Sequence, residues 1–248
     1  FVNALMEIFN CEIEWMSSAS EGEWLNRNTG SGAVRLAIAT VKGTSHDLLQ
    51  VERLALNVLT RCSSIATESR SMKEFVRERG YNNEIAATRK TTPLFRLVEK
   101  YGVIVGGCSP HRYDVSQMCM LKDNHIDLFK KKLNTTNQSE AITAAVKSAR
   151  QLGGFSLMIE VECRSLQDAK DAAKAGANIV MLDNFSADQV REEARLLKGE
   201  YPNVTVEVSG GLRRDNITAY LTNSVDVFSM GSLIEGVPTV DFSMKINS

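Results

Sequence analysis

Hydrophobic and polar positions follow two different patterns along this chain, and the change falls near Asn82. Up to Tyr81, stretches with apolar residues at helical spacing alternate with stretches in which every second residue is apolar, as in a half-buried strand. The helical stretches are 1–9 and 47–68, the strand-like stretches are 11–15 and 34–39, and the Ser-, Gly- and Asn-rich stretch 17–32 is typical of a surface loop or hairpin. Residues 1–82 are therefore predicted to form an open α/β sandwich domain.

Beyond Asn82 a single unit repeats: a short apolar run, a glycine or polar residue, and then an amphipathic helix. Continuous apolar runs favour parallel strands buried on both faces, and their alternation with helices favours β/α units that close into a barrel. The predicted strands are 84–88, 103–107, 118–121, 156–162, 178–183, 205–209 and 225–230. We therefore expect an α/β protein with an irregular seven-stranded β/α barrel over residues 83–235, and a C-terminal tail, 236–248, that packs back on the N-terminal domain.

Two details concern the helices of this barrel. Ser165 with Asp168, and Ser186 with Gln189, have the spacing of a capping box, so helices are expected to begin at these serines. Residues 127–140 form a polar insertion with three consecutive lysines, and we expect a solvated surface loop there.

Composition and charge exclude several classes of protein. The chain is 43% hydrophobic and 24% charged, which is ordinary for a globular protein. Its 29 basic and 30 acidic residues give a net charge of −1, so we expect neither a nucleic-acid partner nor a membrane partner. No apolar run reaches membrane-spanning length and no signal-peptide pattern is present, which predicts a cytoplasmic protein. Any anion-binding site must therefore be local.

The cysteines predict neither disulfides nor a zinc site, because they are odd in number, scattered and free of CxxC spacing. They are Cys11, Cys62, Cys108, Cys119 and Cys163. We expect reduced thiols that pack as small hydrophobic groups. The sequence begins with Phe1 inside a predicted helix, so the N-terminal domain is expected to be incomplete at its start.

Candidate chemistry lies at the ends of the predicted strands. In β/α barrels, functional groups lie just beyond the C-terminal ends of the strands. Here each predicted strand ends at a charged group or a glycine, which packing alone does not require. These residues are Arg89, Lys90, Gly106, Gly107, Lys122, Glu162, Asp183, Ser209, Gly210, Gly211 and Gly231.

Cations are concentrated in residues 88–126, where they alternate with short apolar runs. Converging cations repel one another unless an anionic ligand offsets their charge. The glycines at the last two strand ends match a phosphate cradle, in which backbone N–H groups approach the ligand. A solvated surface and plain glycine turns are the simpler interpretations of each feature alone. Together they favour a site for a polyanionic sugar phosphate that meets a dicarboxylate.

This stretch also resembles a known family. The strings ATRKTTP, FRLVEKYG, HRYD and LKDNHI, in this order and spacing, are similar to quinolinate phosphoribosyltransferases. The likeness continues upstream through ERLALNVLTRCSSIAT and downstream through IEVECRSLQDA, VMLDNFS, VSGGL and FSMGSL. The resemblance implies the same irregular barrel and a transferase of pyridine nucleotide and NAD biosynthesis. Such an enzyme would transfer phosphoribose from 5-phosphoribosyl 1-diphosphate to quinolinate, giving nicotinate mononucleotide, pyrophosphate and carbon dioxide.

The resemblance further implies roles for individual residues. Quinolinate would lie against Arg89, His111, Arg112 and Lys122, with Arg53 reaching in from another subunit of a homodimer or hexamer. Lys90 and Lys122 would bind the pyrophosphate side, and Glu162 and Asp183 would hold ribose hydroxyls and Mg²⁺. These four residues form the expected catalytic set. The 5-phosphate would be held by Ser209, Gly210, Gly211 and Gly231.

Two alternatives remain open at this point. The chain could be a phosphoribosyltransferase for a different pyridine or azole, although Arg89, His111 and Arg112 favour a dicarboxylate. It could also be an inactive barrel that binds phosphorylated ligands, although the retained Lys122, Glu162 and Asp183 argue against lost activity.

Overall fold

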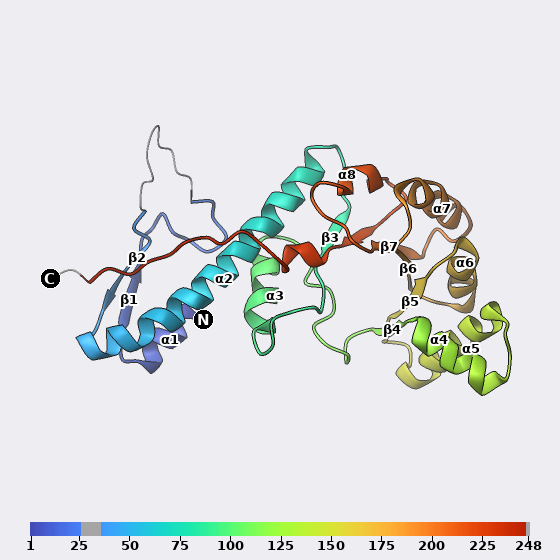
Figure 1. The fold of residues 1–248 in the computed structure, drawn as a ribbon, viewed down its shortest axis with the longest axis horizontal. Coiled ribbons are helices and arrows are strands. Elements are labelled where there is room, and N and C mark those ends of the chain that lie inside the picture. Colours follow the sequence, from blue (N-terminus) through green and yellow to red (C-terminus); the bar gives the residue numbers. More distant parts are fainter. Residues whose placement is uncertain (26–35, 247–248) are drawn as a thin grey trace.

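The computed structural model describes residues 1–25 and 36–246, and Figure 1 shows the order of its elements. The N-terminal elements are α1 (Val2–Ile8), β1 (Glu12–Trp15), β2 (Ala39–Lys42) and α2 (Ser45–Arg77). The remaining elements are β3 (Glu84–Ala86), α3 (Arg96–Val105), β4 (Cys119–Leu121), α4 (Asp123–Leu133), α5 (Gln138–Gly153), β5 (Ile159–Cys163), α6 (Leu166–Ala175), β6 (Ile179–Asp183), α7 (Ala187–Glu200), β7 (Thr205–Ser209), α8 (Ile217–Tyr220), β8 (Val227–Ser229) and a 3₁₀ turn, η1 (Gly231–Leu233).

The N-terminal part combines a helix and a two-stranded antiparallel sheet with one end of α2. The predicted helix at 1–9 and strand at 11–15 are confirmed as α1 and β1. The predicted strand at 34–39 is displaced, because β2 begins only at Ala39. Residues 34 and 35, and residues 26–32 of the expected loop at 17–32, lie outside the described residues. A small core of Met6, Cys11, Val51 and Ala55 holds this part together.

Helix α2 is much longer than the predicted 47–68 and joins two cores. It begins after Thr44, whose side chain accepts a hydrogen bond from the backbone N–H of Asp47. Val51 lies in the small core, whereas Ile65 and Met72 are buried in the main core, so one rigid helix links the two (Figure 1).

The main core surrounds a six-stranded parallel sheet with the order β3-β8-β7-β6-β5-β4. This confirms the α/β class, and the predicted strands at 84–88, 118–121, 156–162, 178–183, 205–209 and 225–230 all contain or overlap observed strands. The strand predicted at 103–107 is wrong, since these residues form the end of α3 and the turn after it. Its apolar residues instead pack α3 against α2, where a Cβ on Gly106 would lie 2.5 Å from the carbonyl oxygen of Ala66. A single parallel bridge between Ala86 and Ser109 takes the place of the missing strand.

The polar insertion at 127–140 is not the loop that we expected. Most of it belongs to α4 and to the first turn of α5. Ile126 is buried in the main core and Phe129 packs against it, so the segment has an apolar side that a solvated loop would lack. Its three lysines occupy the last turn of α4, where positive charge is favourable beside the helix carbonyls.

Both predicted helix caps are confirmed. The Ser165 hydroxyl accepts from the backbone N–H of Asp168 over 3.1 Å, and Ser186 forms a full capping box with Gln189. All five cysteines are free. None of the helices in the described part of the chain is long and apolar enough to span a membrane.

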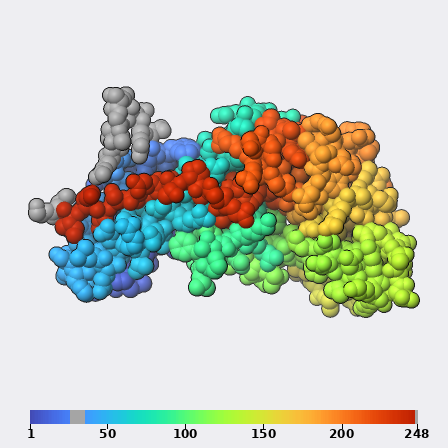
Figure 2. Space-filling view, in the orientation of Figure 1, coloured from blue at the N-terminus to red at the C-terminus, as the bar shows by residue number. Residues whose placement is uncertain are grey.

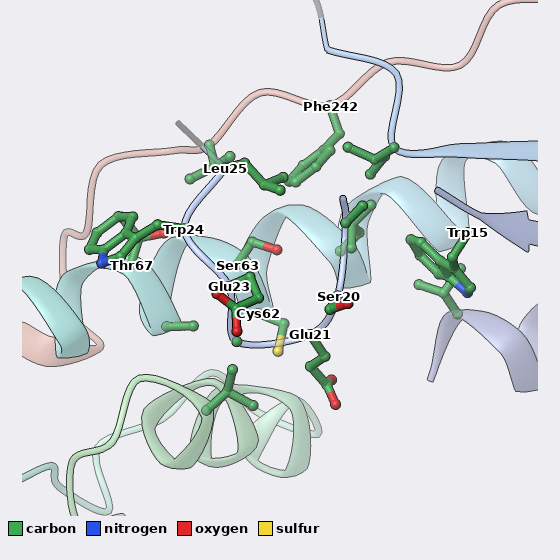
Figure 3. Close-up of a pocket in the computed structure, with 18 of the residues that line it drawn as sticks. Trp15, Ser20, Glu21, Glu23, Trp24, Leu25, Cys62, Ser63, Thr67 and Phe242 are labelled. Carbon is green, nitrogen blue, oxygen red and sulfur yellow. The ribbon is translucent and has the colours of Figure 1, made fainter. Parts of the chain in front are cut away.

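The C-terminal segment runs back along α2 toward the N-terminal part (Figure 2). The backbone N–H of Val240 donates to the hydroxyl of Ser64 on α2 over 2.9 Å. Val240 and Phe242 also border a large hollow of about 1090 Å³ beside α2 (Figure 3). Trp24 lies at this hollow, and its ring N–H donates to Glu74 over 3.3 Å. The hollow is lined mainly by uncharged side chains, so it is not the predicted anion-binding site.

The predicted domain boundaries, at residues 82 and 235, stay a prediction.

Candidate active site

A second, polar cavity of about 780 Å³ lies at the carboxyl ends of the parallel strands. The carboxyl ends of parallel strands meet at one edge of a sheet, so side chains far apart in sequence converge there. The structure brings together these predicted residues: Arg89, Lys90, His111, Arg112, Lys122, Glu162, Asp183, Ser209, Gly210, Gly211 and Gly231. Arg53 is not among them, since it lies exposed on α2. Gly106 and Gly107 are also absent from the lining, because they follow α3 and face α2.

The carboxylates on β5 and β6 form one charged group with the lysine after β4. Lys122 Nζ lies 2.6 Å from Oε2 of Glu162, whose side chain is only 10% exposed. Burial, and then the neighbouring charge of Glu162, raise the pKa of the Asp183 carboxyl, although the side-chain amide of Asn184 donates to it over 2.7 Å. This raised pKa means that a further cation beside these two carboxylates would be stabilising.

His111 is held by protein groups at both ring nitrogens. Its Nδ1 accepts from the backbone N–H of Arg112 over 2.7 Å, and its Nε2 lies 3.1 Å from Oε1 of Glu207. Because Nδ1 is an acceptor here, these partners assign the ring hydrogen to Nε2, which donates to Glu207. His111 also has a positive φ of 56°, so its backbone is strained. The imidazole therefore fixes the backbone turn that leads into Arg112.

The sequence analysis missed two carboxylates of the cavity region, Glu160 and Glu207. Glu160 is fully buried and its side-chain oxygens lack a hydrogen-bond partner in the described structure. Burial, and then the charge of Glu207, raise its pKa to about 8. Arg112 lies close enough to act on Glu160 electrostatically, and burial followed by the charge of Arg89 lowers the pKa of the Arg112 guanidinium.

The carboxylates of Glu160 and Glu207 form a cluster with His111 in which one atom of each lies within 4.8 Å of the others. Such a cluster has the donor types of a metal site. Here, however, His111 already uses both nitrogens within the protein, and the neighbouring Arg112 supplies positive charge. We therefore interpret Glu207 as a counter-ion of Arg112, and Glu160 as a buried carboxyl group that retains its proton up to about pH 8. Their signal in the sequence was the two-residue spacing on each strand, Glu160 with Glu162 and Glu207 with Ser209, which places both members on one face.

At Gly210 after β7 and Gly231 after β8, the backbone lies close to neighbouring groups of the protein, with no room for a side chain at Gly210. Gly210 has a φ of +111°, and an added Cβ would lie 2.5 Å from Oδ1 of Asn184. Gly211 also has a positive φ, +62°, and Gly231 would place a Cβ 2.8 Å from Oε2 of Glu235. Only glycine fits Gly210 without strain, so this edge can present backbone N–H groups to an anion.

The parallel sheet, the convergent cations and the glycines after β7 and β8 are typical of phosphate-binding enzymes built from β/α units. The particular family follows from comparison: the family model for "Quinolinate phosphoribosyl transferase, C-terminal domain" matches residues 65–245. The chain belongs to this quinolinate phosphoribosyl transferase family.

Individual relatives agree with this assignment. The human protein named nicotinate-nucleotide pyrophosphorylase [carboxylating] is 42% identical over 247 residues, which cover 99% of this chain and 76% of the relative. The Dictyostelium discoideum protein of the same name is 40% identical over 97% of this chain and 80% of the relative. The crystal structure of NadC from Streptococcus pyogenes matches with a TM-score of 0.80 and 32% identity over 98% of this chain and 79% of that chain.

Proposed function

We propose that this chain transfers phosphoribose from 5-phosphoribosyl 1-diphosphate to quinolinate with loss of carbon dioxide, giving nicotinate mononucleotide and pyrophosphate for NAD biosynthesis. The observation that carries the proposal is the convergence of Arg89, Arg112 and Lys122 with the glycines of β7 and β8 in one cavity. One part of this cavity suits a dicarboxylate and the other suits a phosphate. The names of the relatives supply the reaction that joins these two ligands.

Quinolinate is proposed to bind through its carboxylates to Arg89 and Arg112, with His111 and Lys122 beside it. The planar fork of an arginine pairs with both oxygens of a carboxylate, which gives geometry as well as charge. His111 would border this site while its ring nitrogens remain bound to Glu207 and to the backbone of Arg112. Lys122 must then share its charge between Glu162 and the substrates.

The diphosphate is proposed to bind along the other part of the cavity. Ser209, Gly210, Gly211 and Gly231 would hold the 5-phosphate, and Lys90 and Lys122 the pyrophosphate. As the bond from ribose C1 to pyrophosphate weakens, the ribose gains positive charge, which Glu162 and Asp183 stabilise. The quinolinate nitrogen attacks C1. The resulting pyridinium ring withdraws electrons from the adjacent carboxylate, so that the bond to this carboxylate breaks and carbon dioxide leaves. The electron pair left on the ring carbon takes up a proton from water, which gives nicotinate mononucleotide.

Mg²⁺ is proposed as the cofactor, and the residues present fit it. Glu162 and Asp183 offer the oxygen ligands that Mg²⁺ prefers, and their mutual repulsion would fall on binding a cation. When bound, the ion would neutralise charge on the leaving pyrophosphate.

A cytoplasmic location stays a prediction that the odd number of free cysteines supports.

The active site is also proposed to be shared between the subunits of a homo-oligomer, a dimer or a hexamer. Arg53 lies exposed on α2, outside the cavity of its own chain, and its neighbour Leu54 is 48% exposed. In a two-fold assembly the same arginine of the partner can add a cation to the quinolinate part of the site.

The experiment is incubation of the protein with quinolinate, 5-phosphoribosyl 1-diphosphate and Mg²⁺, with detection of carbon dioxide and nicotinate mononucleotide. Nicotinic acid, which lacks the 2-carboxylate, serves as the matched control and should be a poor substrate because an arginine would be left unpaired. Equal kcat/KM values for the two acids would contradict the proposed dicarboxylate site. Turnover with another pyridine or an azole instead would support the alternative transferase, and no turnover with any acceptor would support an inactive barrel.

A further inference from the structure

Helix α3 carries two adjacent charged residues that are buried outside the cavity. Glu99 is 0% exposed and Lys100 is 2% exposed, and both belong to the FRLVEKYG string. Neither residue lines the polar cavity, so neither contacts the proposed substrates. Burial of a charged group is unfavourable unless specific partners compensate it. Their partners are therefore informative.

Glu99 binds the loop that follows β3. Its Oε2 accepts from the backbone N–H of Thr92 over 2.9 Å, and its Oε1 accepts from the Thr92 hydroxyl over 2.8 Å. The same carboxylate forms an ion pair with Arg61 of α2 over 2.7 Å. Thr92 lies two residues after Lys90, so Glu99 fixes the loop that presents Arg89 and Lys90 to the cavity.

Arg61 connects Glu99 to the turn after β8, which contains Gly231 of the proposed phosphate site. Besides its bonds to Glu99, it donates through Nη2 to the backbone carbonyl of Ile234 over 2.9 Å. Ile234 ends the turn that begins at Gly231, whose backbone lines the cavity. One buried carboxylate thus connects the cation loop after β3 with the glycine turn after β8.

Lys100 binds a third segment of the cavity wall. Its Nζ donates to the backbone carbonyl of Arg112 over 2.7 Å and also to the carbonyl of Pro110. These carbonyls flank His111, so the ammonium holds the strained turn that presents Arg112. No carboxylate pairs with Lys100 in the described part of the chain. Burial, followed by the positive charges of Arg96, Arg89 and Arg112, lowers the pKa of the Lys100 ammonium group to about 8.

We propose that Glu99 and Lys100 are positioning residues, which use α3 as a common support to fix three substrate-binding segments relative to one another. This inference rests on the proposed function. The three segments are the loop with Arg89 and Lys90, the turn with His111 and Arg112, and the turn that begins at Gly231. The first two have irregular backbone, and the sheet contacts of these segments end at Ala87 and Ser109, so side-chain bonds from α3 add support beyond the sheet edge.

Because Glu99 and Lys100 bind different segments, replacing each of them should change the KM for a different substrate. Lys100 supports the quinolinate part of the site through Arg112, whereas Glu99 supports the diphosphate part through the Lys90 loop and the Gly231 turn. A displacement of about 1 Å in a binding group can reduce kcat/KM by up to about 100-fold. A purely structural role would instead lower the amount of folded enzyme and leave both KM values unchanged.

The test compares Lys100→Met, which keeps the length of the side chain, with Lys131→Met at an exposed position of α4. Lys100→Met should raise the KM for quinolinate by about 10-fold or more and change the KM for the diphosphate by less than about 3-fold. Lys131→Met should behave as the wild type.

Glu99→Gln should give the opposite division, a raised KM for the diphosphate, because the amide NH₂ would face the donors of Thr92 and Arg61. Its control is Glu192→Gln on the exposed side of α7. Thr92→Val removes one hydroxyl donor at an exposed residue and should raise the KM for the diphosphate about 3-fold.

Each outcome decides between the possibilities. Unchanged KM values in the folded Lys100→Met and Glu99→Gln variants would overturn the positioning role, while wild-type turnover would keep the proposed function intact. If these variants do not fold, Thr92→Val decides, and an unchanged KM for the diphosphate in that variant would overturn the inference. Absence of turnover in the wild type would refute the proposed function itself.

Discussion

His111 Nε2 donates a hydrogen bond to Oε1 of Glu207 over 3.1 Å, with side chains that are only 9% and 3% exposed. The bond joins the turn after α3 to strand β7, two segments that are nearly one hundred residues apart. Because of this bond, and because Nδ1 accepts from the backbone of Arg112, His111 has no ring N–H left to donate to a ligand. The role of His111 is to fix the backbone conformation at Arg112 through the hydrogen bond from the Arg112 N–H to Nδ1.

Replacement of Glu207 tests this relationship. Glu207→Ala would leave the buried Nε2–H without an acceptor, which costs about 1–3 kcal/mol in unfolding free energy. Glu207→Gln retains an oxygen acceptor and should lose less. Urea denaturation of both variants measures the difference, with Glu192→Ala as the exposed control. Equal destabilisation by Gln and Ala would contradict the assigned hydrogen bond.

Lys122→Ala should lower kcat by about 100-fold or more, because it removes a cation that balances both Glu162 and the bound anions. Lys131→Ala, on the exposed face of α4, is the matched control. Steady-state assays of pyrophosphate release measure the effect. Near-normal turnover of the Lys122 variant would show that the site assignment is wrong.

Glu160 should make stability depend on pH. Its pKa rises from the ordinary value of 4.5 to about 8 in the folded chain, so the folded state retains a proton that the unfolded state has lost. Its contribution to stability is therefore fully present below about pH 4.5 and is lost as the pH rises through about 8. Glu160→Gln should gain stability relative to the wild type between pH 5 and pH 7.5. Thermal unfolding across this range checks the trend, and a constant difference would refute it.

Gly210 and Gly211 provide a matched pair of substitutions. Both have a positive φ, but only Gly210 has a close neighbour, Oδ1 of Asn184, 2.5 Å from an added Cβ. Gly211→Ala should therefore lose only the backbone strain, about 1–2 kcal/mol. Gly210→Ala should be less stable than that and should also raise the KM for the diphosphate. Denaturation and kinetics of the two variants, side by side, test whether close backbone approach matters at this edge.

A mixed assembly tests the shared site. If Arg53 of one chain serves the cavity of another, dimers that combine Arg53→Ala with Lys122→Ala hold one doubly altered site and one intact site. Random reassortment should then restore roughly a quarter of wild-type activity, since half of the dimers are mixed and half of their sites are intact. Refolding the two variants together, with mass analysis of mixed dimers, provides the measurement. Activity no greater than the sum of the parents would remove Arg53 from the site.

The sequence determined most of the sheet and most of the charged residues that line the cavity. Parallel strands buried on both faces leave continuous apolar runs, and their ends carry the residues that converge, so Lys122, Glu162 and Asp183 could be identified from position alone. The helix caps at Ser165 and Ser186 could also be predicted from the sequence, because an N-cap is a local interaction.

Tertiary structure decided what local pattern could not. The apolar run at 103–107 suits a strand or a helix equally well, and only packing of α3 against α2 made it helical. The residues that support the site, Glu99, Lys100, Glu160 and Glu207, were also hidden, since a charged residue in a sequence gives no sign of its burial. Their roles come from partners that are distant along the chain, as in the bond from His111 to Glu207. Local physics therefore set the elements and their ends, whereas long-range contacts chose which charges are buried and what they hold in place.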